Sequence, residues 1–172
     1  MKTLVRCTIL LLLMLAGAGA QAADDGGGTV IVTFSGSEGS VLGIMEIGPT
    51  AADPQKAAGL GIKYEHTDEH YKFDGTYLAL TAVFMSGEDW QKFVAMWAKA
   101  RDAQGKTDAG EYFADSTLLS VGMESNGSIT FTMAANPDAN NVPKDMYVFF
   151  LQPKDFGAFD EGVKKVSAFF AN

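Results

Sequence analysis

The sequence predicts an α+β fold, in which antiparallel β-sheets pack against two amphipathic helices. Three observations support this prediction. Short apolar runs are separated by turn residues, two later segments repeat apolar residues at helical spacing, and several strands precede each helix. The predicted strands are 29–34, 41–47, 62–64, 71–73, 77–85, 118–123, 129–133 and 146–151.

Two of the predicted strands, 77–85 and 146–151, differ from the others because they are almost entirely apolar. Continuous apolar runs of this kind are typical of strands that are covered on both faces. Two of the eight methionines fall in the first 22 residues, and most of the others lie in such strands or on a helix. We expect the methionines after residue 22 to fill the core.

The first predicted helix starts after Ser86, a good N-cap residue, and ends near Ala103. Its apolar stripe contains Trp90, Phe93 and Trp97, which are spaced by three and four residues. The second helix starts at Pro153, because proline is favoured in the first turn. The apolar face of this second helix consists of Phe156, Phe159, Val163, Val166 and Phe169.

The strands 118–123 and 129–133 form the clearest predicted hairpin. A two-residue Asn126-Gly127 turn would place the apolar residues of the two strands on opposite faces. A three-residue loop, 125–127, pairs Met123 with Ile129 and gathers the apolar residues on one face. A slip of one residue reverses every side chain, so we predict the second register, with Gly127 in the left-handed conformation.

The two junctions between strand and helix align without gaps at an offset of 66 residues. Residues 84–90 and Phe93 match residues 150–156 and Phe159. The alignment is consistent with a duplicated unit of a β-meander and a helix, and also with any buried strand that precedes a surface helix. A duplicated order of this kind resembles the folds of the Whirly and PUR single-strand-binding proteins. The resemblance is one of topology, and it transfers no site residue.

The two histidines, His66 and His70, lie in the tip of a predicted hairpin whose four-residue loop is 66–69. This loop would pair residues 62–64 with 71–73 and set His70 opposite Glu65. The two imidazoles and the nearby carboxylates are suitable ligands for zinc or copper. A usable site needs three or four converging ligands, so we expect a solvated turn and no bound cofactor, and keep a metal site as the alternative.

The first 22 residues have the three parts of a secretory signal peptide. A positive start with Lys2 and Arg6 precedes the apolar segment 9–16, and the small residues 20–22 form a cleavage site. The apolar segment is too short to span a bilayer. We therefore expect a periplasmic or secreted protein with no membrane insertion, a flexible leader over 23–28, and a single domain over 23–172. The chain has one cysteine, Cys7, so the exported part has no disulfide.

The chain is acidic, with 13 basic and 21 acidic residues. Removal of the first 22 residues changes the formal net charge from −8 to −10, because both charges in that segment are positive. Nucleic acids and anionic membrane surfaces attract basic proteins. The charge therefore argues against either of them as a partner.

The sequence favours an exported, soluble, non-enzymatic protein that binds a protein or a small molecule. The candidate binding regions are three long predicted loops, 48–59, 104–115 and 134–145, because loops commonly carry function. Tyr112 and Phe113 form an aromatic pair in the second loop and are candidate partner anchors. The alternatives are a metal-binding protein that uses His66 and His70, and a carboxylate-dependent hydrolase.

The first testable prediction concerns export. We expect the exported protein to begin at Ala23, or at Gln21 if the earlier small-residue site, 18–20, is cleaved. N-terminal sequencing of exported material checks this, and material that begins at Met1 would contradict it.

Overall fold

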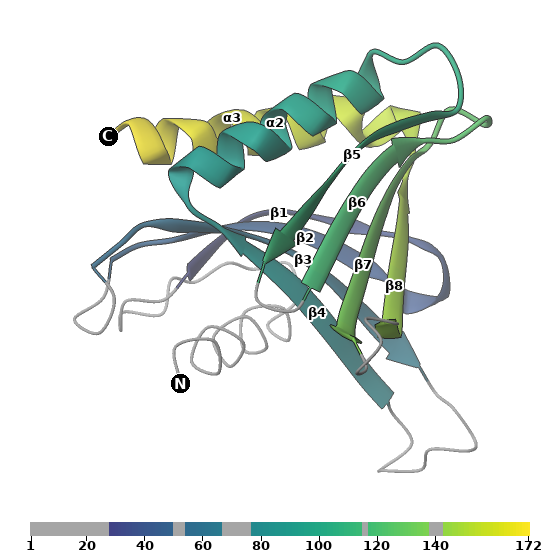
Figure 1. The fold of residues 1–172 in the computed structure, drawn as a ribbon, viewed down its shortest axis with the longest axis horizontal. Coiled ribbons are helices and arrows are strands. Elements are labelled where there is room, and N and C mark those ends of the chain that lie inside the picture. The colour runs from purple at the N-terminus through teal and green to yellow at the C-terminus, as the bar shows by residue number, and fades with distance from the viewer. Residues whose placement is uncertain (1–27, 50–53, 67–76, 115–116, 138–142) are drawn as a thin grey trace.

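The computed structural model describes residues 28–49, 54–66, 77–114, 117–137 and 143–172, which form two four-stranded antiparallel sheets and two helices (Figure 1). The predicted α+β fold is confirmed. In the first half, the order is β1 (Gly28–Ser35), the 3₁₀ turn η1 (Ser37–Gly39), β2 (Val41–Ile47), β3 (Ala57–His66), β4 (Tyr77–Met85) and α2 (Gly87–Arg101). In the second half, it is β5 (Thr107–Ala114), β6 (Thr117–Met123), β7 (Ile129–Pro137), β8 (Pro143–Leu151), the 3₁₀ turn η2 (Pro153–Asp155) and α3 (Phe156–Ala171).

The two halves are structural repeats of one unit. Sheet 1 has the strand order β1-β2-β3-β4 and sheet 2 has the order β5-β6-β7-β8, so each is a simple meander that a helix follows. Strands β4 and β8 have nine residues each and start 66 positions apart, as the junction alignment predicts. The first strand of each sheet also has a register shift near its third residue, in β1 after Val30 and in β5 after Asp108.

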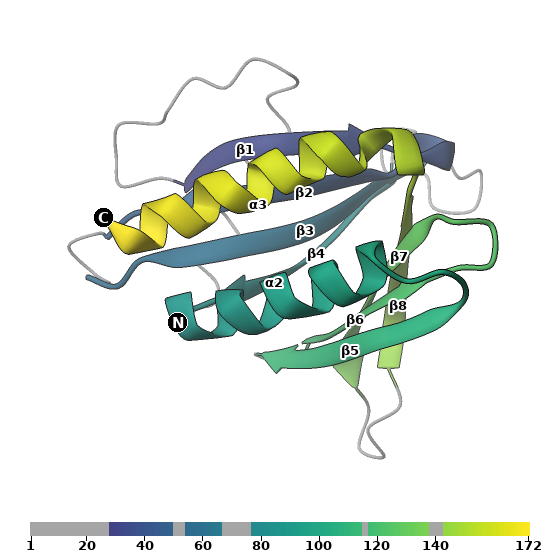
Figure 2. The same cartoon turned by 90° about the horizontal axis from the view of Figure 1, so that it is seen from above.

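Each helix packs mainly against the sheet of the other half. Helix α3 lies over β1 and β2, and α2 lies against β5 and β6 (Figure 2). Gly162 of α3 allows this approach, because a Cβ atom there would be 2.6 Å from Cγ1 of Val32 in β1. In the other pair, Met96 of α2 touches β5, and its Sδ would be 3.0 Å from a Cβ atom at Gly110. The two halves therefore share one hydrophobic core.

Aromatic rings from both helices and sheet 2 occupy the centre of this shared core. The rings of Trp97 in α2 and Phe159 in α3 have centroids 4.3 Å apart, and Phe131 of β7 lies 5.2 Å from Phe159. Trp90, Phe93 and Phe159 are fully buried. Phe156 is half-buried. The first turn after Pro153 is the 3₁₀ turn η2, so α3 starts at Phe156, three residues later than predicted.

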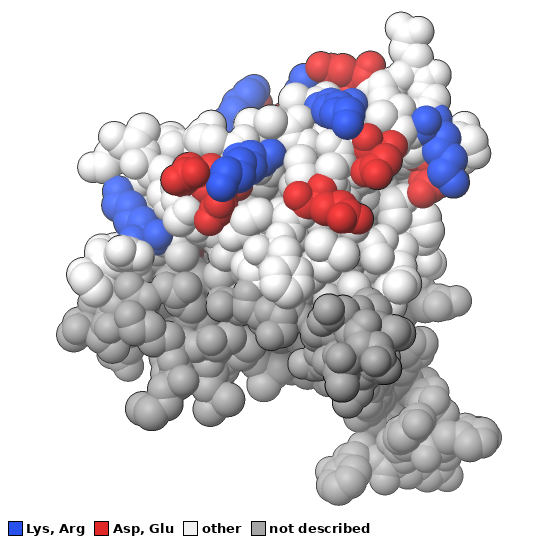
Figure 3. Space-filling view, viewed as in Figure 1, with Lys and Arg blue, Asp and Glu red and all other residues white. Residues whose placement is uncertain are grey.

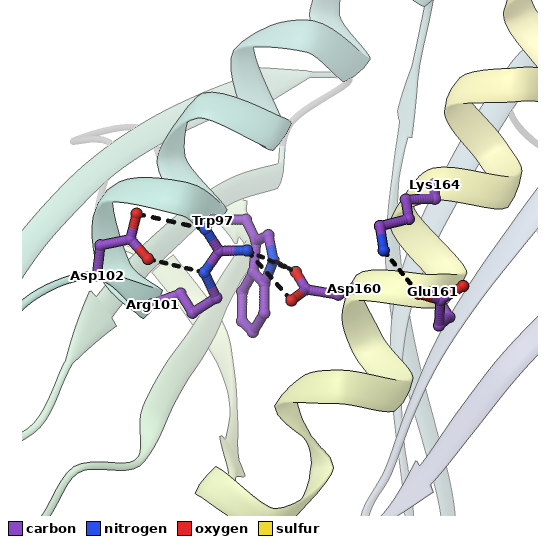
Figure 4. Close-up of polar contacts among 6 residues, drawn as sticks. All are labelled: Trp97, Arg101, Asp102, Asp160, Glu161 and Lys164. Atoms are coloured by element: carbon purple, nitrogen blue, oxygen red, sulfur yellow. Dashed lines mark hydrogen bonds and ion pairs between the residues drawn. The ribbon is translucent and has the colours of Figure 1, made fainter.

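Polar contacts fix the antiparallel contact between the helices. Nε1 of Trp97 donates a 2.6 Å hydrogen bond to Asp160, and Arg101 donates to both carboxylate oxygens of Asp160 at 3.0 and 3.1 Å (Figure 4). At the other end of the helix pair, Nε1 of Trp90 donates to Oγ of Ser167 at 3.0 Å. Both buried indoles thus have partners, which removes the cost of burying a polar N–H.

The predicted hairpin of β6 and β7 is confirmed in its register. Met123 pairs with Ile129, and Val121 pairs with Phe131. Gly127 has a φ of +82°, the left-handed conformation that favours glycine in this turn. The predicted N-cap is also confirmed, since the backbone N–H of Asp89 donates to Oγ of Ser86.

The predicted hairpin around His66 is wrong. Strand β3 runs from Ala57 to His66 and pairs with β4, so Ile62 lies opposite Thr81 and Glu65 lies opposite Leu78. The small residues 57–59 of this strand fall in the predicted loop 48–59, so that loop is shorter than expected. The structure explains one of them: a Cβ atom at Gly59 would be 2.8 Å from Cγ of Met45. The predicted strand 71–73 lies outside the described residues.

The other two predicted loops are also shorter than expected. Strand β5 occupies most of 104–115, although its sequence is polar, and β7 and β8 extend into 134–145 as far as Pro137 and Pro143. Strand β4 is an edge strand in the order of hydrogen bonds. Its inner residues Val83 and Met85 nevertheless lie in the shared core, and Phe84 on the other face belongs to a second cluster with Met45, Ile47 and Ala57.

The second prediction tests the shared core. The Phe159→Ala substitution should destabilise the protein by about 3–5 kcal/mol, because it removes a buried ring that packs against both halves. Such a loss lowers the melting temperature by about 10 °C in a chain of this size. The matched control is Phe113→Ala, whose ring is 64% exposed and whose loss should change stability by less than about 0.5 kcal/mol. Equal effects in thermal denaturation would contradict this account of the core.

The third prediction concerns pH. Partial burial of Glu46, in β2, raises the pKa of its carboxyl above the usual value. Its protonated form therefore stabilises the fold below the unfolded-state pKa of 4.5, and this contribution is lost as pH rises through the raised value. Glu46→Gln should raise the melting temperature at pH 7 and leave it unchanged near pH 3. An equal rise in melting temperature at pH 3 would exclude the ionisation of Glu46 as the cause.

Candidate functional site

The predicted aromatic pair lies on strand β5, and its two rings face opposite sides of sheet 2. Tyr112 is half-buried and packs against the shared core. Phe113 points to the outer side, where its side chain is 64% exposed. Neighbouring residues in a strand point to opposite faces. The two residues therefore do not form one anchor, and Phe113 alone is on the surface.

Phe113 belongs to an apolar row that crosses all four strands of sheet 2. It pairs with Leu118 of β6, which pairs with Ala134 of β7, which in turn pairs with Met146 of β8. This row is the first of three cross-strand rows that together define the outer face of sheet 2. They are Phe113, Leu118, Ala134 and Met146; Glu111, Ser120, Thr132 and Val148; and Asp108, Gly122, Thr130 and Phe150.

The exposed large apolar side chains of the described residues all lie on this outer face. They are Phe113 at 64%, Met146 at 66% and Phe150 at 47%. Phe113 and Met146 lie at the two ends of the apolar row, and Phe150 lies four residues after Met146 on the same side of β8. Single exposed apolar residues are ordinary, but three on one face of one sheet make that face the candidate interaction surface.

The matching face of sheet 1 shows how unusual this exposure is within the molecule. Phe84 of β4 occupies the position equivalent to Phe150 of β8, 66 residues earlier, and it is only 7% exposed. Met45 and Ile47 lie in the same cluster as Phe84 and are buried. At the end of the sheet that holds Phe84 and Phe150, the outer side is therefore covered in sheet 1 and open in sheet 2.

Met146 and Phe150 are the residues of this face that sequence reasoning missed. The apolar run 146–151 predicts a strand that is covered on both faces, and the methionines were expected in the core. That prediction is wrong for β8, since its outer residues are exposed while Phe149 and Leu151 are buried. No signal within β8 distinguishes the two cases, because Phe84 and Phe150 each lie between two apolar residues.

The outer face has acidic groups beside its apolar residues. Glu111 lies in the second row and accepts a 3.3 Å hydrogen bond from Ser120. Asp108 lies at the register shift of β5, where its Oδ1 accepts from the backbone N–H of Gly110 at 3.0 Å. Next to the third row, Glu124 accepts from Thr130 and forms a long ion pair with Lys106. None of the residues that define the outer face is basic.

The surface of α2 differs from this face in its charge pattern. Charged side chains of both signs gather over α2 in Figure 3. On α2, Lys92 forms ion pairs with Glu88 and Asp89 within one helical turn. Alternating charges of this kind are typical of a solvated helix surface.

The two carboxylates that contact Arg101 are the candidates for acid–base catalysis on the helices. Arg101 binds Asp160 on α3 and also Asp102, at 2.8 Å from its Nε (Figure 4). The hydrogen bond from Arg101 lowers the pKa of Asp102. A general acid needs a raised pKa and an available proton, and these two carboxylates are held as ion pairs. We assign them to the helix contact.

The described residues do not test the histidine pair as a metal site. His66 ends β3, where its backbone lies opposite Tyr77, and His70 lies outside the described residues. Among the described residues, no group of three or more His, Cys, Asp or Glu side chains is placed to hold a metal ion. Nor does any described helix have the length and apolar character of a membrane span.

Comparison with known proteins gives no relative: no family model, curated protein or solved structure matches the chain. The order of elements that resembles the Whirly and PUR proteins is therefore a likeness of topology. The candidate site depends on the geometry of this chain alone.

Proposed function

We propose that the protein is an exported, non-enzymatic binding protein, and that the outer face of sheet 2 holds a protein partner. The observation that supports this proposal most strongly is the location of Phe113, Met146 and Phe150. These large apolar side chains are exposed on one face, while Phe84, the counterpart of Phe150 in sheet 1, is covered.

The arrangement of the face suits a protein better than a compact small molecule. Phe113 lies on the edge strand β5, and Met146 lies on the opposite edge strand β8, so the contact would extend across the whole sheet. The polar hydroxyls of Ser120, Thr130 and Thr132 lie between or beside these residues. Apolar anchors that are separated by hydrogen-bonding groups are typical of protein interfaces.

The charge of the face identifies the kind of protein. A second copy of the chain would add a second set of the acidic groups Asp108 and Glu111 to the contact, which is unfavourable. The net charge of −10 after residue 22 adds a long-range repulsion between copies. We therefore infer a different protein, whose contact surface has apolar side chains bordered by lysine or arginine.

The fourth prediction tests this surface with defined peptides. An extended peptide of alternating leucine and lysine should bind and shift the backbone NMR signals of the three rows. Matched peptides with glutamate in place of lysine, or serine in place of leucine, should bind at least about tenfold more weakly, because each lacks one of the two features of the face. Shifts that map to α2 or α3 would contradict the proposal.

Variants separate the apolar contribution from the charged one. The double substitution Phe113→Ser and Met146→Ser should abolish peptide binding, whereas Gln91→Ala on the exposed side of α2 should not. Glu111→Gln should reduce the salt dependence of binding, with Glu88→Gln on α2 as the matched control. Equal binding by all variants, or self-association in sedimentation that the double substitution abolishes, would overturn the assignment to a basic partner.

A further inference from the structure

A pocket of about 320 Å³ lies at the edge of strand β8, between the first hairpin and the start of α3. Its lining comes from both halves of the chain. Ser35, Gly36, Ser37 and Ser40 belong to the β1–β2 connection, and residues 148–150, Gln152, Lys154 and Asp155 belong to β8 and η2. Its size falls at the lower end of the range for small-ligand sites.

The floor of this pocket is fixed by close packing. Gly36 lies so near its neighbours that a Cβ atom there would be 2.4 Å from Oγ of Ser40 and 2.8 Å from Cε2 of Phe149. Both neighbours are buried, and Oγ of Ser40 donates a 2.7 Å hydrogen bond to the carbonyl of Ser37. The backbone N–H of Gly36 donates to the carbonyl of Ser40 at 2.8 Å. The floor therefore exists before any ligand binds.

The rim of the pocket carries polar groups that the protein itself does not use. Within the described part of the chain, the side chains of Ser35, Ser37, Lys154 and Asp155 make no hydrogen bond or ion pair. Asp155 is the N-cap residue of α3, but its carboxylate accepts no capping hydrogen bond. Lys154 is a donor, Asp155 is an acceptor, and the serine hydroxyls act as both.

An aromatic ring completes the site. Phe150 lines the pocket and is 47% exposed on the outer side of β8, whereas the side chain of Phe149 is on the opposite side of the strand and is buried. An exposed ring next to mixed donors and acceptors matches a ligand that has an apolar face of C–H groups and a rim of hydroxyls. We propose that this pocket binds a neutral saccharide, of one or two sugar units, with one sugar face on Phe150.

The charges on the rim argue for a neutral ligand. Lys154 and Asp155 have opposite charges and are the two charged residues of the lining, so the lining has no net formal charge. An anion would meet the carboxylate of Asp155, and a cation would meet the ammonium group of Lys154. A hydroxyl-rich neutral molecule can donate to Asp155 and accept from Lys154 at the same time.

The fifth prediction tests the pocket with purified protein and a panel of sugars. Glucose, galactose, N-acetylglucosamine and maltose are titrated, and binding is followed by NMR. At least one of them should shift the signals of residues 35–37 and 152–155. Asp155→Asn and Lys154→Gln should each weaken its binding about tenfold, because each removes a hydrogen bond to a charged group. Neither residue belongs to the outer face of sheet 2, so failure of this test leaves the protein-binding proposal intact.

Controls make the outcome decisive. Lys165→Gln on the exposed side of α3 should not affect sugar binding, and Asp155→Asn should leave the melting temperature unchanged, because the carboxylate makes no capping bond. Absence of any shift up to high sugar concentration would overturn the proposal. So would tighter binding of glucose 6-phosphate or glucosamine than of glucose, since either result would indicate a charged ligand.

Discussion

The rest of the structure depends on the exchange of helices between the two halves. Because α3 lies on sheet 1 and α2 lies against sheet 2, neither meander has its own helix as its main cover. The exchange brings Trp97 and Phe159 into contact at the centre of the core. Asp160 then accepts hydrogen bonds from both Trp97 and Arg101, which fixes one helix against the other. Neither half can bury its apolar face alone, so the two halves stabilise each other.

The sequence predicts well those features that depend on local chemistry. The register of β6 and β7 follows from the need to place Met123 and Ile129 on one face, and the N-cap at Ser86 follows from its position before an acidic first turn. The order of a meander and a helix in both halves follows from the alternation of short strands with helical spacing. These features depend on neighbours in sequence, for which periodicity is a reliable guide.

The features that the sequence does not predict depend on contacts between distant residues. Gly59 weakens the strand pattern of β3, yet its place in the strand is fixed by Met45 on β2. Phe113 was a candidate anchor because of its polar surroundings, and the structure places it on the surface. Phe150 was not a candidate, because its run is as apolar as that of Phe84. Only the packing around each sheet distinguishes the exposed ring of Phe150 from the covered ring of Phe84.

The difference between Phe84 and Phe150 also links the fold to the proposed binding functions. The two halves have the same order of elements, but these equivalent positions have different surroundings. Phe150 lies where the outer face of sheet 2 meets the pocket, and Gly36 of the other half forms the floor beside it. That floor exists only because the β1–β2 connection packs against β8. The arrangement that joins the two halves into one core therefore also forms the pocket beside Phe150.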